Sequence, residues 1–143
     1  MASAKETPDA KRKASWRRIL IADDHEHVRM SLRSLLESRH DLKVCGEAKD
    51  GEEAVQMARE LNPDLIILDV HMPVLDGISA AKQIKSILPN VPVLMHSMYN
   101  GEQMDQMSRL AGAQGFVCKA DTHRVLLNAV NTLLQGRTFF HET

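Results

Sequence analysis

The sequence is poor in aromatic residues and cysteine and has no long hydrophobic segment, and each shortage excludes a class of protein. With one tryptophan, one tyrosine and three phenylalanines in 143 residues, the core must be aliphatic. The two cysteines, Cys45 and Cys118, lack metal-site spacing and are expected to be free, buried thiols. No apolar segment approaches the roughly 20 residues of a membrane span, and the N-terminus lacks the apolar stretch of a signal peptide. We therefore expect a cytoplasmic protein without a membrane partner.

Charge is nearly balanced over the chain but unevenly distributed along it. The formal net charge is -1, of which residues 1–18 contribute +4 and the remainder -5. A chain of this length suits a single domain. We expect a basic, disordered N-terminal tail over residues 1–17, one domain over 18–136 and a short C-terminal tail over 137–143. Weak, sequence-independent contact of the basic tail with nucleic acid stays open as an alternative.

From Arg18 onward, short apolar segments alternate with segments of helical periodicity. Strands are predicted over 19–22, 42–45, 65–68, 91–95 and 115–118, and helices over 28–36, 54–61, 78–87, 104–111 and 125–134. This alternation indicates an α/β fold in which a parallel sheet is covered by helices on both faces. Right-handed crossovers favour the flavodoxin-like, doubly wound five-stranded sheet of order 2-1-3-4-5 with five helices.

Polar side chains follow the predicted strands at the points where they end. Asp23 and Asp24 follow the first strand, Asp69 the third, Ser97 the fourth and Lys119 the fifth. In an open parallel sheet, ligands bind outside the carboxyl ends of the strands. Since the first and third strands are neighbours in the predicted order, the three carboxylates should converge on one pocket, with a hydroxyl and an ammonium at its rim.

This set of groups suits phosphoryl transfer to a carboxylate. Unpaired acids packed together raise one another's pKa, which a hard cation such as Mg²⁺ would relieve. Asp69 could then take a phosphoryl group as an acyl phosphate, while Lys119 supplies positive charge and Ser97 a hydroxyl donor. Taken singly, each acid would be interpreted as a helix cap or turn residue. Their coincidence at one sheet edge favours a site.

The motifs closely resemble the receiver domain of bacterial two-component response regulators, over about residues 18–136. The resemblance rests on Asp23-Asp24, on Asp-Val-His-Met-Pro-Val-Leu-Asp-Gly over 69–77, on Ser97, and on Gly-Ala-Gln-Gly-Phe-Val-Cys-Lys ending at Lys119. It implies that Asp69 accepts a phosphoryl group from the phosphohistidine of a sensor histidine kinase or phosphotransfer protein. It also implies Mg²⁺, for which Mn²⁺ can substitute, bound by Asp24, Asp69 and the backbone carbonyl of His71, with Asp23 nearby.

The resemblance also implies a switch. Ser97 would move toward the phosphoryl group and Phe116 would change rotamer with it. The surface formed by the helix over 104–111, the strand over 115–118 and the helix over 125–134 would then be remodelled to bind partners, with a phosphorylation-dependent homodimer as one outcome. The turn behind the site would contain Met72-Pro73 and Asp76-Gly77, with Gly77 supplying backbone freedom.

Some positions depart from the family pattern. Lys119 is followed by Ala120 where most receivers have a proline after a cis bond, so the loop there is expected to differ in shape. A lysine without that proline, together with the end of the last helix, is most similar to receivers of regulators that carry a LuxR-type helix-turn-helix. His71, Met98 and Tyr99 occupy positions that tune phosphoryl lifetime or access in the family.

The same residues leave three alternative functions to consider. An aspartyl-phosphate phosphatase usually has an Asp-x-Asp pair, and His71 fills the second place here, so we expect a signalling receiver and not an enzyme. A transcription factor would need a DNA-binding domain that cannot fit after Gly136, so no sequence-specific DNA binding by this chain is expected. A histidine metal site near the same edge, drawn from His25, His27, His71 and His96, is disfavoured because the spacing of these residues indicates no ligand set.

Overall fold

The computed structural model describes residues 16–99 and 101–140. The strands are β1 (Arg17–Ala22), β2 (Leu42–Ala48), β3 (Leu65–Asp69), β4 (Val93–Ser97) and β5 (Gly115–Cys118). The helices are α2 (Glu26–Leu36), α3 (Gly51–Leu61), α4 (Gly77–Ile87), α5 (Glu102–Leu110) and α6 (Thr122–Leu134), with a single 3₁₀ turn over Lys119–Asp121. Most of the expected N-terminal tail and the end of the C-terminal tail lie outside the described residues. The described part contains no helix long and apolar enough to cross a membrane.

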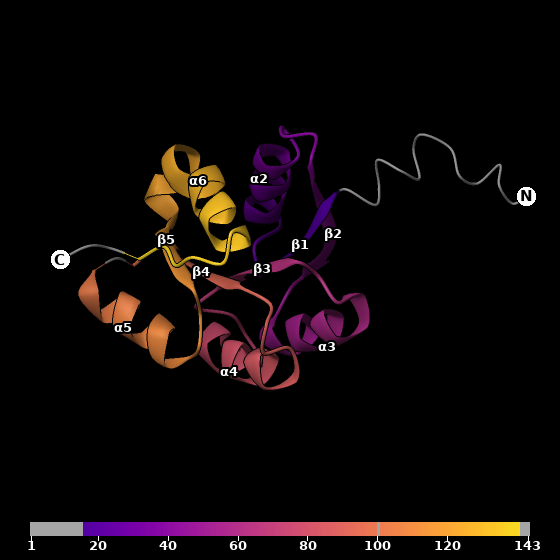
Figure 1. Cartoon of the computed structure of the whole chain (residues 1–143). Helices are drawn as coiled ribbons and strands as arrows, with labels where there is room; N and C mark the ends of the chain where they lie inside the picture. The colour runs from indigo at the N-terminus through magenta and orange to yellow at the C-terminus, as the bar shows by residue number, and fades with distance from the viewer. Residues whose placement is uncertain (1–15, 100, 141–143) are drawn as a thin grey trace, which may run out of the picture.

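The five strands form one parallel sheet in the order β2-β1-β3-β4-β5. Helices α2 and α6 cover one face, and α3, α4 and α5 cover the other (Figure 1). The predicted flavodoxin-like order is therefore confirmed. The order places the ends of β1 and β3 side by side, because Ala22 pairs with Leu68 directly before the acidic residues.

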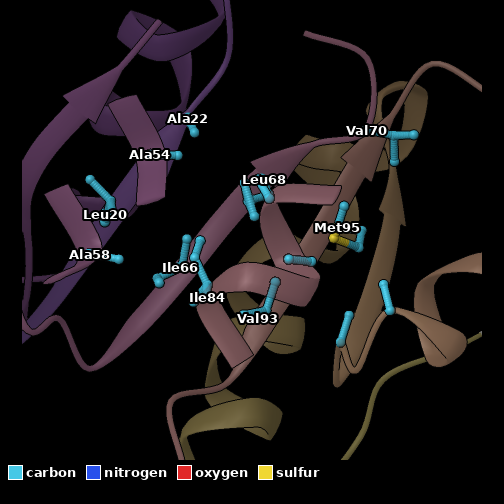
Figure 2. Packing of buried hydrophobic residues seen from close by; sticks show 14 of the residues in the cluster. Leu20, Ala22, Ala54, Ala58, Ile66, Leu68, Val70, Ile84, Val93 and Met95 are labelled. Atoms are coloured by element: carbon cyan, nitrogen blue, oxygen red, sulfur yellow. The ribbon is translucent and has the colours of Figure 1, made fainter. Parts of the chain in front are cut away.

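Each strand contributes alternate side chains to two apolar layers, as the two-residue period of a strand requires. Leu20, Ile66 and Leu68 face α3 and α4 (Figure 2), whereas Ile19 and Ile67 face α2 and α6. All five of these side chains are completely buried. Burial on both faces is the reason that the strands are continuous apolar segments in the sequence.

β2 and β4 end two or more residues later than the apolar pattern predicts, and β3 ends one residue later. β2 continues to Ala48 because a bulge at Cys45 shifts its register against β1, so that Gly46 pairs with Leu20. Cys45 is consequently only partly buried, whereas Cys118 is buried as expected. β4 begins at Val93, after Pro92, and continues through two polar residues, His96 and Ser97, that are nevertheless buried.

The turn between β3 and α4 corrects one expectation. Gly77 does not have a positive φ; the residue that does is Val74, at φ 69°, where the Leu75 N–H donates to the Pro73 carbonyl at 2.7 Å in a γ-turn. Glycine is needed at position 77 for a steric reason. A Cβ there would lie 1.9 Å from the carbonyl oxygen of Asp69. The first residue of α4 thus packs directly on the backbone of the strand end.

The peptide bond between Lys119 and Ala120 is trans, since the described residues contain no cis peptide bond. The loop after β5 begins with this bond. Its residues form the 3₁₀ turn that leads into α6.

The segment after α6 folds back on the outer edge of β5. Phe139 forms a parallel bridge with Gly115, accepting from the Phe116 N–H and donating to the Gln114 carbonyl, both at 2.9 Å. The ring of Phe140 lies under the guanidinium of Arg109, 3.9 Å from ring centroid to Cζ. The edge of the sheet is therefore paired over this short stretch.

The contact between Gly77 and Asp69 leads to a prediction. Gly77→Ala should lower the free energy of unfolding by about 2 kcal/mol or more, because the methyl group must push α4 away from the end of β3. Helix propensity alone would give the opposite sign, a gain of about 1 kcal/mol. Urea unfolding measures the difference. Gly136→Ala is the control, because nothing lies within 4 Å of a Cβ there and only the strain of its φ of 84° is added. Equal stability of Gly77→Ala and the wild type would contradict the steric explanation.

Candidate functional site

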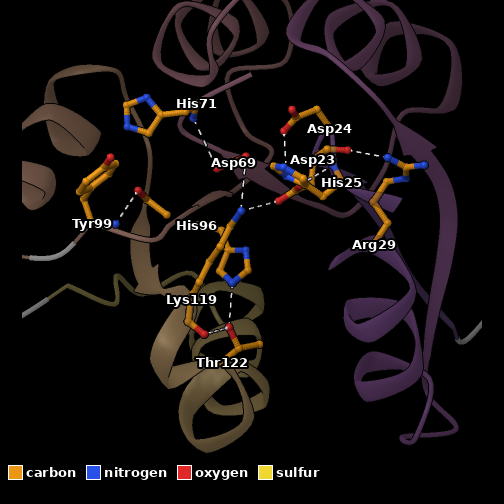
Figure 3. A network of polar contacts seen from close by, with 11 residues as sticks. Asp23, Asp24, His25, Arg29, Asp69, His71, His96, Tyr99, Lys119 and Thr122 are labelled. Atoms are coloured by element: carbon orange, nitrogen blue, oxygen red, sulfur yellow. Dashed lines mark hydrogen bonds and ion pairs between the residues drawn. The ribbon is translucent and has the colours of Figure 1, made fainter. Parts of the chain in front are cut away.

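The acidic residues that follow β1 meet the acidic residue that ends β3. Ligand atoms of Asp23, Asp24, His25 and Asp69 all lie within 4.8 Å of one another (Figure 3). Asp23 and Asp69 are buried, whereas Asp24 and His25 are exposed. The structure thus brings together the three carboxylates that the sequence places at strand ends, with Lys119 reaching them from the end of β5.

Asp23 is the anchored member of the group. Its Oδ2 lies 2.8 Å from the ammonium of Lys119, and its Oδ1 accepts from the backbone N–H of His25 at 2.8 Å. Its carbonyl accepts from Arg29 Nη1 at 2.7 Å, while Arg29 Nε donates to Glu47. Burial raises the pKa of Asp23, but the hydrogen bonds from Lys119 and His25 outweigh burial and leave the pKa below its ordinary value. Asp23 is therefore ionised and fixed.

Asp69 has weaker partners and the opposite shift. Lys119 Nζ is 3.5 Å from its Oδ2, and the N–H of His71 donates to its Oδ1 at 3.4 Å. Burial, followed by the charge of Asp23, raises the pKa of Asp69 to about 6, although Lys119 acts in the other direction. A buried carboxylate whose pKa is raised by neighbouring acids is stabilised as an anion when positive charge is placed beside it.

Lys119 is the cation that the structure provides. Its side chain is 16% exposed and contacts both buried carboxylates. Burial lowers the pKa of Lys119, but the bond to Asp23 and the charges of Asp69 and Asp23 raise it above its ordinary value. One ammonium between two carboxylates leaves an excess of negative charge, to which Asp24 adds. The excess and the oxygen chemistry of the donors fit a hard divalent cation such as Mg²⁺.

His25 belongs to the acidic cluster, although the sequence indicated it only as one of four histidines of a disfavoured metal site. Its Nδ1 lies 3.2 Å from Oδ1 of Asp23 and 3.2 Å from Oδ1 of Asp24. Among the described residues, it is the one histidine of the four considered that joins a group of three or more candidate ligands. Its position directly before α2 was the available signal.

The candidate switch residues are Ser97 and Phe116. Within the described part of the chain, neither forms a hydrogen bond with Asp69. Ser97 is completely buried, and its Oγ accepts from the Tyr99 N–H at 3.1 Å. Phe116 is 2% exposed and packs in the layer of α3, α4 and α5. Tyr99 and Met98 are exposed, and the Tyr99 ring meets His71 edge-on at 5.3 Å (Figure 3).

A second buried polar residue of β4, His96, lies beneath the site. Its Nε2 is 2.8 Å from Thr122 Oγ1, and its Nδ1 has no hydrogen-bond partner in the part of the chain that is described. Burial, and secondarily the charge of Lys119, lowers the pKa of His96 to about 4. The imidazole is therefore neutral at physiological pH.

With this geometry established, comparison with known proteins assigns the family. The family model described as the response regulator receiver domain matches residues 19–131. The chain belongs to the response regulator receiver family. This receiver is 40% identical over 128 residues to "Protein-glutamate methylesterase/protein-glutamine glutaminase 1" of Methanosarcina acetivorans, covering 88% of the chain and 36% of that protein. It is 35% identical over 123 residues to "Response regulator protein VraR" of Staphylococcus aureus, covering 86% of the chain and 59% of that protein.

A solved structure supports the same assignment and the resemblance to the LuxR subfamily. The two-component response regulator of the LuxR family from Aurantimonas sp. SI85-9A1 superposes with a TM-score of 0.84 at 34% identity. The match covers 87% of this chain and 89% of that one. The curated relatives are longer, since the chain spans 36% of one and 59% of the other.

The opposite pKa shifts of Asp69 and Asp23 predict opposite effects on stability. The folded pKa of Asp69 is about 6, above its ordinary 3.8, so its ionisation destabilises the fold. That cost is absent below the ordinary pKa, grows as pH rises and is complete above the folded pKa. Asp69→Asn should therefore be more stable than the metal-free wild type at about pH 7.5, by up to about 3 kcal/mol, and nearly equal to it at about pH 4.

Asp23→Asn is the matched control. The pKa of Asp23 is lowered, so its charge contributes stability above the ordinary pKa that is lost as pH falls through the folded value. Its amide should destabilise the protein at neutral pH, because Lys119 loses its closest partner. Urea unfolding in EDTA at the two pH values measures both variants. Destabilisation by Asp69→Asn at neutral pH would contradict the assignment of the raised pKa.

Proposed function

We propose that this receiver is phosphorylated on Asp69 in a two-component phosphorelay. The observation that carries the proposal is the pairing of an ionised, anchored Asp23 with a buried Asp69 of raised pKa on either side of Lys119. A carboxylate of raised pKa is more basic than an ordinary aspartate and so a better nucleophile, and Lys119 lies where it can offset the negative charge that a phosphoryl group adds. The donor is a sensor histidine kinase or a phosphotransfer protein.

In the proposed reaction, a carboxylate oxygen of Asp69 attacks the phosphorus of a phosphohistidine. The O–P bond forms as the P–N bond breaks, and the electron pair leaves with the imidazole, which takes up a proton. Lys119, 3.5 Å from Asp69, neutralises charge on the phosphoryl oxygens. The N–H of His71 already points to Asp69 and limits the rotation of its carboxylate. Hydrolysis of the acyl phosphate by water would return the receiver to its resting state.

Asp23, Asp24, Asp69 and the backbone carbonyl of His71 would hold a magnesium ion, for which manganese can substitute. The bound ion would supply positive charge to the phosphoryl oxygens. The fit is supported by the three carboxylates whose oxygens gather within 4.8 Å and by the raised pKa of Asp69.

We further propose that the Ser97 hydroxyl takes part in the switch. Because its oxygen accepts from the Tyr99 N–H, turning the hydroxyl toward a phosphoryl group on Asp69 would change the loop after β4. That loop joins β4 to α5, and Phe116 packs on the same side of the sheet. The surface of α5, β5 and α6 would thereby carry the signal to a partner, including a second copy of the chain. His71, Met98 and Tyr99 would tune the lifetime of the phosphoryl group.

The proposed role is signalling, with catalysis limited to the receiver's own phosphorylation and dephosphorylation. His71 stands two residues after Asp69, where an aspartyl-phosphate phosphatase would need a second acid. The activity in the name of the methylesterase relative belongs to a protein of which this chain matches 36%. We also propose that the protein is cytoplasmic. The proposed division of the chain is a tail over 1–17, a receiver over 18–136 and a tail over 137–143. We expect no sequence-specific DNA binding by this chain.

Incubation with acetyl phosphate and Mg²⁺ tests the phosphorylation. Intact-mass spectrometry should find a single phosphoryl adduct on the wild type and none on Asp69→Asn. Lys119→Gln should still bind Mg²⁺ but form the adduct about 100-fold more slowly, because it lacks the charge that meets the phosphoryl oxygens. Thr132→Val, a change on the exposed side of α6, serves as the control and should react like the wild type. An unchanged adduct on Asp69→Asn would rule out Asp69 as the acceptor.

Metal titrations test the ligand set. Asp24→Asn should weaken Mg²⁺ binding at least about tenfold, because it removes the solvent-facing carboxylate of the cluster. His25→Ala should change Mg²⁺ affinity little and reduce Zn²⁺ affinity, because imidazole nitrogen is a ligand for the softer metal. Titration calorimetry with Mg²⁺ and with Zn²⁺ measures the affinity of each variant for each metal. Equal loss of Mg²⁺ affinity in both variants would show that His25 is a magnesium ligand and overturn the proposed set.

A further inference from the structure

The turn that carries Lys119 is tied down by a short chain of hydrogen bonds. The carbonyl of Lys119 accepts from the Thr122 N–H and, at 2.9 Å, from the Thr122 hydroxyl. The same hydroxyl oxygen lies 2.8 Å from Nε2 of His96, a residue of β4 that is 2% exposed. Figure 3 shows the three residues in line beneath the carboxylates.

The hydroxyl has only one proton, which decides how the chain is ordered. If it donated to His96, the Lys119 carbonyl would lose one bond and the protonated Nδ1 of His96 would be a buried donor without a partner among the described residues. If the hydroxyl donates to the Lys119 carbonyl, His96 Nε2–H donates to the Thr122 oxygen. The atom of His96 that then lacks a partner among the described residues is Nδ1, as an acceptor and not as a donor. The second arrangement forms two hydrogen bonds where the first forms one. His96 is therefore protonated on Nε2.

Packing does not replace these bonds. A cavity of about 180 Å³ lies on this side of the turn, lined by His27, His96, Lys119, Thr122 and His123 among others. The turn is a single 3₁₀ turn with no buried residue of its own. The Thr122 hydroxyl is thus one of two groups that bond the Lys119 carbonyl, and the bond from His96 favours the direction in which that hydroxyl donates to Lys119.

We propose that Thr122 and His96 are positioning residues for Lys119, setting where its ammonium stands relative to a phosphoryl group on Asp69. The inference rests on the proposed phosphorylation of Asp69. The ammonium must lie near both Asp23 and Asp69 to serve the reaction, and its distances of 2.8 Å and 3.5 Å are already unequal. A small rotation of the turn moves it further from Asp69.

Kinetics on the full chain test the proposal. Thr122→Val keeps the shape but removes the hydroxyl, and should slow phosphorylation by acetyl phosphate roughly tenfold with an unchanged Mg²⁺ dissociation constant. Thr122→Ser should restore most of the rate. His96→Leu should have a smaller effect than Thr122→Val, because the Thr122 hydroxyl can still donate to Lys119. Thr132→Val, whose hydroxyl bonds the Asn128 carbonyl on the same helix, is the matched control and should react at the wild-type rate.

A double variant separates positioning from general loosening. In a Lys119→Gln background, Thr122→Val should have no additional effect on the rate, because the residue through which it acts is gone. A Thr122→Val variant as fast as the wild type, or an equal slowing in that background, would overturn the proposal.

Nuclear magnetic resonance distinguishes this proposal from the proposed function. The ring nitrogens of His96 should show the Nε2–H form, and the side-chain ε signals of Lys119 should shift in Thr122→Val but not in Thr132→Val. If the wild type acquires no phosphoryl adduct, the proposed function is refuted. The NMR signals would still show whether Thr122 and His96 position Lys119. A His96 protonated on Nδ1, or an unmoved Lys119, would refute it.

Discussion

The site depends on one half-buried ammonium placed between two buried carboxylates. Lys119 lies 2.8 Å from Asp23 and 3.5 Å from Asp69, so the charge of Asp23 is the better compensated and Asp69 is left with a raised pKa. If Lys119 lay equally close to both, both carboxylates would be stabilised as anions and neither would have a raised pKa that favours it as the nucleophile. The unequal sharing gives the two carboxylates different roles, one as an anchor and one as a nucleophile, although both lie at ends of neighbouring strands.

The fold produces this inequality by fixing the two carboxylates from separate directions. Asp23 is held by the first turn of α2 through the His25 N–H and by Arg29, which also reaches Glu47 on β2. Asp69 is held from behind, where α4 rests on its carbonyl. Each support comes from a different layer of the protein, so the geometry of the site depends on the packing of the whole sheet.

The strand ends could be predicted from the sequence because an apolar segment that stops at a polar residue is a local signal, and the sheet order follows from handed crossovers. Asp23, Asp69 and Lys119 were found in this way. The support of the site could not be found, since the contacts of Thr122 with His96 and of Gly77 with Asp69 depend on how separate segments pack against one another. The same limit applies to the end of β4, where polarity in the sequence suggested a loop and the tertiary structure buried the residues. The 3₁₀ turn after Lys119 was not predicted.

The pairing of Phe139 with Gly115 has a consequence for behaviour at high concentration. An open sheet has two outer strands whose free N–H and C=O groups can recruit a strand from another molecule. On the β5 side, two backbone hydrogen bonds of the chain's own C-terminal segment occupy part of that ladder. On the β2 side, the bulge at Cys45 and the exposed Lys43 interrupt it. Each edge strand is thus protected in a different way, and both features disfavour pairing of the sheet with a strand of another molecule.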